Sequence, residues 1–200
     1  MSDQEAKKNQ KRIYLKIIIQ GILSLIAVIG IMLIAAGRWN YWKGWAFGGT
    51  TFGLTIAGII VFRNRMELIQ ERARPGPGTK WWDKVFYGLY VPVNFAIFLV
   101  GSLDSGQYHW SGEMPAWVYV IGYVVFLASH FFTRWCMLVN KFFSTTVRIQ
   151  MDRGQEVVQA GPYRIVRHPG YLGGIFLIIS FALVLGSLWA LIPSGAAVLL

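Results

Sequence analysis

Residues 161–173 hold the densest group of side chains in this chain that could bind a ligand or assist a reaction. The stretch contains two Arg, one His, two Tyr and two Pro, and it lies between a polar segment and a long apolar run. Basic side chains can bind an anion, His can carry a proton, and Tyr offers a ring face and a hydroxyl. The stretch is therefore a candidate functional site.

The order of residues within this stretch predicts a ligand site at the start of a helix. Pro169 biases His168 away from helical geometry and suits the first turn of the helix that follows. The N–H groups at a helix start bind anions, and Gly170 and Gly173 allow backbone to approach closely. Together these features suit a ligand with a flat ring and a carboxylate. The alternative interpretation is a basic loop that fixes membrane topology, with its tyrosines at the interface.

The composition predicts a polytopic membrane protein. The 200 residues are 55% hydrophobic and 14% charged, whereas soluble domains carry roughly 25% charged residues. The net charge of +10 would suggest nucleic acid as a partner of a soluble protein. Here the cations flank long apolar runs, so anchoring beside anionic lipid explains them and we expect no nucleic-acid partner. The single cysteine, Cys136, excludes an internal disulfide and a multi-cysteine metal site, and we expect no metal.

The apolar runs predict an all-α bundle of about five membrane spans with a C-terminal helical hairpin. The first run follows a basic N-terminus and is too long for a signal peptide, so it is expected to be retained. From Tyr171 the chain is apolar for 30 residues, longer than the ~20 that one span needs. Gly186-Ser187 interrupts this run, which indicates either one span and the start of another or a tight hairpin. The first four spans are expected at about 13–36, 44–62, 85–103 and 116–138.

Polar segments between the runs predict how the chain lies in the membrane. The N-terminus, residues 63–84 and residues 141–168 hold most of the Lys and Arg. The positive-inside rule then places all three in the cytoplasm, with the 161–173 stretch at the cytosolic mouth of the bundle. The sequence predicts a short helix at residues 63–74 and a loop at residues 104–115. It predicts a strand or an extended loop at residues 141–154.

Two ionisable residues, His130 and Arg134, lie one turn apart in the second half of the fourth predicted span. Groups at that depth normally face the bundle interior or a polar cavity. We expect His130 to be a packed or hydrogen-bonded residue of the core. Arg134 is near enough to the end of the span to extend its charge to the interface.

The motif Gly161-Pro162-Tyr163-x-x-Val166-Arg167-His168-Pro169-x-Tyr171-x-Gly173 resembles the signature of a known family. It is similar to the isoprenylcysteine carboxyl methyltransferase family and to the related phospholipid methyltransferases. The resemblance extends upstream through Asn140, residues 142–144, 147–150 and 155–158. It covers roughly residues 130–190, and the earlier spans resemble the family by hydropathy alone.

The resemblance implies an integral membrane enzyme that uses the cofactor S-adenosylmethionine (SAM) and methylates a lipid-like acceptor. It implies that the polar segment and the start of the next helix hold SAM. Gln155 stands where many relatives have His. Carried over position by position, the cofactor-binding residues are Gln150, Gln155, Glu156, Val157, Val158, Tyr163, His168, Pro169, Gly170 and Tyr171. The same comparison gives Arg167 and His168 as catalytic residues, with Arg167 as a structural cation or as one that orients a carboxylate.

The acceptor group decides what catalysis requires. The favoured reaction is carboxyl O-methylation of a lipid-like or isoprenylated cysteine substrate, where the carboxylate is already a nucleophile and needs alignment and desolvation. A phospholipid amine is the alternative acceptor; it must lose a proton, which would make His168 a base. A noncatalytic membrane protein of the same fold, or a nicotinamide-dependent lipid or steroid reductase, would also fit the membrane layout.

The chain divides into two predicted parts. Residues 1–138 form the N-terminal transmembrane helices, and residues 139–200 form the cofactor-binding segment and C-terminal helices. The family pattern continues after its last helix pair with an Arg and two acidic residues. The sequence reaches Leu200 before such a motif, so we expect either a longer chain or a member without that part.

Overall fold

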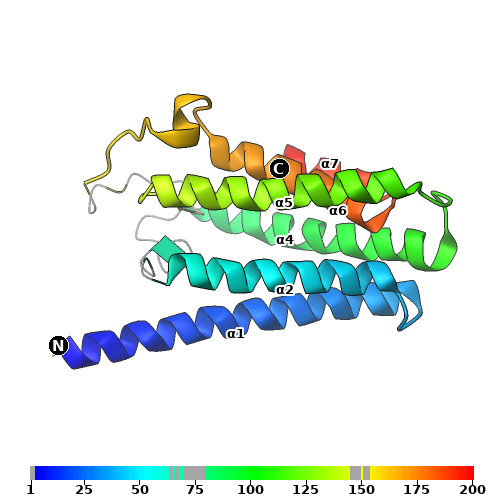
Figure 1. The fold of residues 1–200 in the computed structure, drawn as a ribbon, viewed down its shortest axis with the longest axis horizontal. Helices are drawn as coiled ribbons and strands as arrows, with labels where there is room; N and C mark the ends of the chain where they lie inside the picture. The colour runs from blue at the N-terminus through cyan, green and yellow to red at the C-terminus, as the bar shows by residue number, and fades with distance from the viewer. Residues whose placement is uncertain (1–2, 64, 66–67, 70–79, 145–149, 151–153) are drawn as a thin grey trace.

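The computed structural model describes residues 3–63, 65, 68–69, 80–144, 150 and 154–200. All regular secondary structure within these residues is helical, which confirms the all-α prediction (Figure 1). Most of the predicted short helix at 63–74 and of the predicted extended segment at 141–154 lies outside the described residues. Those two predictions therefore stay predictions.

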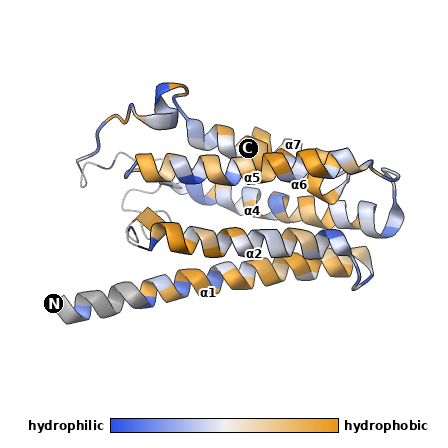
Figure 2. Cartoon of the chain, viewed as in Figure 1, coloured by the Kyte–Doolittle hydropathy of each residue, from blue (hydrophilic) through white to orange (hydrophobic). Residues whose placement is uncertain are grey.

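Four helices are long and apolar enough to cross a membrane. The membrane-crossing lengths are Arg12–Ala36, Trp42–Phe62, Trp81–Tyr108 and Ala116–Val139. They belong in turn to α1 (Asp3–Ala36), α2 (Trp42–Phe62), α4 (Trp81–Ser102) with a following π-helical turn, and α5 (Ala116–Val139). Figure 2 shows hydrophobic residues along these helices and hydrophilic residues in the connections at their ends.

The helix that follows the candidate site is shorter than the other four. α6 (Pro169–Leu185) has 17 residues, about 26 Å of helix, so a fifth span stays a prediction. α6 ends where Gly186 takes the left-handed conformation at φ 64°. α7 (Leu191–Leu199) then turns back, and its Ser194 hydroxyl lies 3.4 Å from the Ile178 carbonyl of α6. The end of the chain is therefore a helical hairpin.

α5 and α6 form the closest helix pair near the candidate site. A Cβ added at Gly173 would lie 2.7 Å from Thr133 Oγ1, and one added at Gly122 would lie 2.8 Å from Leu183 Cβ. The two contacts join opposite ends of the helices, so the pair is antiparallel. Glycine at each contact lets the backbones approach, as in membrane helix packing generally. This pairing fixes where α6 begins relative to the end of α5.

The residues predicted as a loop at 104–115 begin instead as helix. Leu103–Tyr108 form a π-helical turn that continues α4, and Asp104 within it is fully buried. Its carboxylate accepts hydrogen bonds from the backbone N–H of Ser111 at 2.8 Å and from the hydroxyls of Ser111 and Ser187. Because these donors satisfy the carboxylate, the chain can bury it and extend the helix by another turn.

The N-terminus and the segment leading to α6 lie at the same end of the bundle (Figure 1). The α1–α2, α4–α5 and α6–α7 connections lie at the other end. The described residues of the N-terminus and of the segment leading to α6, two of the regions richest in Lys and Arg, therefore share one end. Assignment of that end to the cytoplasm remains a prediction of the charge pattern.

Candidate functional site

The segment after α5 is held together around Gln150. The Asn140 side chain accepts a hydrogen bond from the Phe142 N–H at 2.9 Å, which turns the chain as α5 ends. Gln150 is buried, and its Nε2 donates to the Phe142 carbonyl at 2.7 Å. A buried amide must be hydrogen-bonded to be stable. The Gln150 side chain therefore connects two parts of the segment that the resemblance assigns to SAM binding.

Two further predicted residues are tied to this segment. The Gln150 N–H donates to the Gln155 Oε1 at 2.5 Å, and the Gln155 N–H donates to the Gln150 carbonyl at 3.3 Å. Glu156 forms an ion pair with Lys141, with 3.2 Å between Lys141 Nζ and Glu156 Oε1. Both side chains of that pair are more than half exposed, so water weakens it. The structure thus brings Gln150, Gln155 and Glu156 together.

A short 3-10 helix, Gly161–Arg164, connects this segment to α6. Gly161 has a positive φ of 55°, and a Cβ added there would lie 3.1 Å from Val139 Cγ2 at the end of α5. Pro162 is buried and Tyr163 is half-buried. Glycine is required at this position both by the backbone conformation and by the contact with α5. The first residues of the motif therefore dock the chain on α5.

The start of α6 has the geometry that the sequence predicts. His168 stands just before the helix with non-helical backbone angles of φ −127° and ψ 65°, and Pro169 occupies the first turn. The N–H groups of Tyr171 and Leu172 both point to the His168 carbonyl, and no side chain caps the helix. Because Pro169 has no N–H, the N–H of Gly170 is the donor at this helix start for which the described residues provide no acceptor.

The rings of His168 and Tyr171 lie side by side at the same place. Their centroids are 5.6 Å apart with 36° between the planes, and both residues are exposed. Arg167 is exposed as well, and Val157 is 85% exposed. The exposed rings of His168 and Tyr171, next in sequence to a basic side chain, could bind a ligand that combines an aromatic ring with a charged group.

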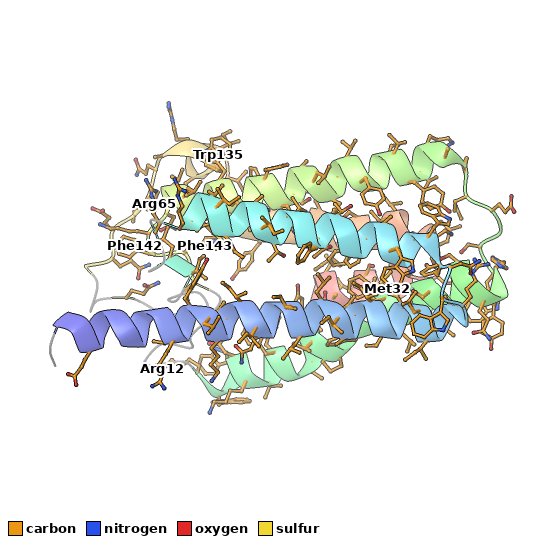
Figure 3. All side chains as sticks on the ribbon, turned by 60° about the horizontal axis from the view of Figure 1, so that its bottom comes forward. Arg12, Met32, Arg65, Trp135, Phe142 and Phe143 are labelled. Carbon is orange, nitrogen blue, oxygen red and sulfur yellow. The ribbon has the colours of Figure 1, made fainter. Side chains whose placement is uncertain are left out.

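Gly170 joins the start of α6 to the segment after α5. A Cβ added at Gly170 would lie 2.6 Å from Phe143 Cε2. Figure 3 shows Phe142 and Phe143 at the same end of the bundle as Trp135 and Arg65, and Met32 farther along it. Among the described residues, no hydrogen bond or ion pair joins Arg167 or Val157 to Gln150. The structure therefore connects some of the predicted site residues, such as Gln150 and Gln155, by hydrogen bonds. Others, such as Arg167 and Val157, have no such bond to Gln150 in the described part of the chain.

Some residues that shape this end of the bundle were not in the predicted set. Lys141 pairs with Glu156, and Phe143 packs on Gly170. Arg65 donates to the Leu138 carbonyl at 3.2 Å, near the end of α5. Phe143 is one of the upstream residues that resemble the family, and this resemblance could have indicated its role. Nothing in the local sequence pairs Arg65 with α5, because 73 residues separate the two partners.

The helices that carry the site also carry the family likeness. Residues 117–200 match the phospholipid methyltransferase family. The matched region contains nearly all of α5, the segment after it, and α6 and α7. The resemblance to the group of membrane methyltransferases is confirmed for this part of the chain. Comparison with curated proteins and with solved structures gives no significant match.

Proposed function

We propose that this protein is an integral membrane methyltransferase that uses SAM to methylate the carboxyl group of a lipid-like acceptor. The observation that carries the methyltransferase part of the proposal is the family match over the region that contains the candidate site. The four membrane-length helices would place the protein in the bilayer, where an amphiphilic acceptor can reach it. An isoprenylated cysteine is the acceptor that the sequence motif favours.

The residues at the start of α6 fit SAM in their chemistry. The N–H of Gly170 suits the carboxylate of the methionine part. The exposed rings of His168 and Tyr171 suit a flat purine. Also in the proposed set are Gln150, Gln155, Glu156, Val157, Val158, Tyr163 and Pro169.

Each part of the segment has a separate role in this proposal. Gln150 and its hydrogen bonds hold the segment in place, and Pro169 presets the helix start. Arg167 orients an acceptor carboxylate by charge. When bound, SAM supplies a methyl group on a positively charged sulfur, and the carbon–sulfur bond breaks as the acceptor oxygen forms the new bond. The protein then contributes alignment and exclusion of water, because a carboxylate needs no base.

A phospholipid amine is the second candidate acceptor, and the family match favours it because the matched family is named for phospholipid methylation. An amine is protonated at neutral pH and must lose a proton before it attacks. The exposed His168 would then act as the base. This candidate makes His168 essential, whereas the carboxylate reaction needs it for binding alone.

Calorimetry with purified full-length protein tests the cofactor. We expect SAM to bind, and His168→Ala and Tyr163→Ala to weaken binding. The absence of SAM binding to folded wild-type protein would remove the methyltransferase proposal. Oxidation of NADPH with a sterol substrate would instead support a reductase.

Transfer of a labelled methyl group to total lipid tests the acceptor. Base treatment releases methyl groups from esters and leaves N-methyl groups in place. We expect base to release the label. A label that resists base would overturn carboxyl methylation and favour the phospholipid amine.

A further inference from the structure

Arg134 is a cation inside a membrane-spanning helix, and part of its guanidinium has no hydrogen-bond partner in the described part of the chain. Its Nη2 donates to the Leu54 carbonyl of α2 at 2.7 Å. Its Nη1 is buried and has no hydrogen-bond partner among the described residues. Ionisable side chains within spanning helices usually pair or line a substrate path, because lipid cannot solvate them. The open Nη1 therefore points to an acceptor that binds from outside the chain.

The guanidinium lies between α2 and α5, where side chains bridge the helices. It rests against Gly58 of α2, since a Cβ added there would lie 3.3 Å from Nη2 and 3.4 Å from Nε. Farther along, the Phe126 ring of α5 meets the Phe47 ring of α2 with centroids 5.7 Å apart. By contrast, α5 approaches α6 with glycine directly against the partner helix at Gly122 and Gly173. Side chains, and not backbone contacts, therefore separate the helices on the α2 side of α5.

Arg134 lies close to the end of the bundle that carries the proposed cofactor segment. It is five residues before the end of α5 at Val139, about 7.5 Å along the helix. The preceding residue, Thr133, contacts Gly173 in the first turns of α6. The next residue, Trp135, is 48% exposed, as is common for Trp near a membrane interface. This depth suits the headgroup of a lipid whose tail lies in the bilayer.

We propose that Arg134 binds the acidic headgroup of an amphiphile that enters from the bilayer between α2 and α5. A guanidinium offers planar donors that match a carboxylate or a phosphate. The amphiphile is the methyl acceptor, and this last step alone rests on the proposed function. The acidic group on Arg134 is a carboxylate if the amphiphile is a fatty acid and a phosphate if it is a phospholipid.

Binding to the full-length protein in detergent, without SAM, tests the headgroup site. The probes are oleate, dioleoyl phosphatidic acid, neutral dioleoylglycerol and inorganic phosphate, each measured by native mass spectrometry or calorimetry. We expect an acidic lipid to bind more tightly than dioleoylglycerol. Arg134→Gln should weaken acidic-lipid binding about 10- to 100-fold, the range for loss of a hydrogen bond to a charged group. Oleate against phosphatidic acid identifies the headgroup, and inorganic phosphate shows whether the tail is needed.

Arg63→Gln is the matched control, because Arg63 is an exposed cation just after the end of α2. It should leave the preference for acidic lipid unchanged. Equal weakening by Arg63→Gln and Arg134→Gln would mean general attraction to positive charge and would overturn the site. Unchanged binding in a folded Arg134→Gln variant would overturn it too.

A photoreactive oleate with a diazirine beside its carboxyl group gives a test that does not depend on variant folding. We expect it to label peptides from α2 and α5 around residues 54–58 and 130–135, with competition by free oleate. Labelling confined to other helices overturns the proposal. SAM calorimetry separates this result from the proposed function. Arg134 can bind an acidic lipid in a protein that does not bind SAM, and SAM can bind to a protein in which Arg134 binds no lipid.

Discussion

The hydroxyl of Ser187 donates a hydrogen bond to the buried carboxylate of Asp104, 83 residues earlier in the chain. Ser111 makes a similar contact, and each serine hydroxyl also accepts a backbone N–H of the α6–α7 connection, from Ala190 or Leu188. A fully buried carboxylate thus ties the α4–α5 connection to the α6–α7 connection at the end of the bundle opposite the candidate site. Its donors are hydroxyl and N–H groups of the protein itself. The carboxylate therefore stabilises the fold at this end of the bundle.

Ser187→Ala is expected to destabilise the protein by about 1–3 kcal/mol, because it leaves a buried carboxylate with one donor fewer. The midpoint of thermal unfolding in detergent micelles measures the effect. Glu113→Gln changes an exposed carboxylate in the same α4–α5 connection and should shift the midpoint little. A Ser187→Ala midpoint equal to that of Glu113→Gln would contradict the structural role.

Gly173→Ala is expected to destabilise the α5–α6 pair, whereas its neighbour Gly174→Ala should not. The added carbon at Gly173 would overlap Thr133 Oγ1 at 2.7 Å, while one at Gly174 meets nothing within 4 Å. Overpacking of this kind costs about 1–3 kcal/mol, and alanine in an open helical position is neutral or slightly favourable. The same unfolding assay compares the two variants. Similar midpoints for both would show that the helices are not in contact at Gly173.

Gly170→Ala is expected to weaken SAM binding roughly tenfold by pushing Phe143 away from the start of α6. The contact would be 2.6 Å to a ring carbon, so the ring or the helix must shift. Calorimetry with SAM measures the affinity, and Gly174→Ala on the same helix is the control. Wild-type affinity in Gly170→Ala would remove this position from the proposed SAM site.

Tyr41→Phe is expected to reduce the loss of stability at alkaline pH. Burial raises the pKa of the Tyr41 phenol above its ordinary value, although the hydrogen bond with Ser105 lowers it in part. The folded protein then keeps this proton at pH values where the unfolded chain releases it, so stability falls as pH rises above about 10. Phe has no proton to lose. Unfolding midpoints measured across that range should decline less steeply in the variant, and identical slopes would contradict the expectation.

Local patterns in the sequence were enough to predict the membrane class, the positions of four spanning helices and the chemical character of the 161–173 stretch. These follow from local rules, because a run of about twenty apolar residues must be helical in lipid. Pro169 and Gly186 marked the start and end of α6 for the same reason, since proline and glycine act on their own backbone. The family motif added the expectation of SAM.

The contacts between distant residues follow from the packing of the helices. Gly170 against Phe143, Arg134 on the Leu54 carbonyl and Asp104 with Ser187 join segments that no local period relates. Hydropathy gives the length of a helix but not the face it turns to its neighbours. Those faces are set by close packing at glycines such as Gly173 and by the need to satisfy each buried polar group. The place of Arg134 between α2 and α5 is therefore a property of the fold and not of any one segment.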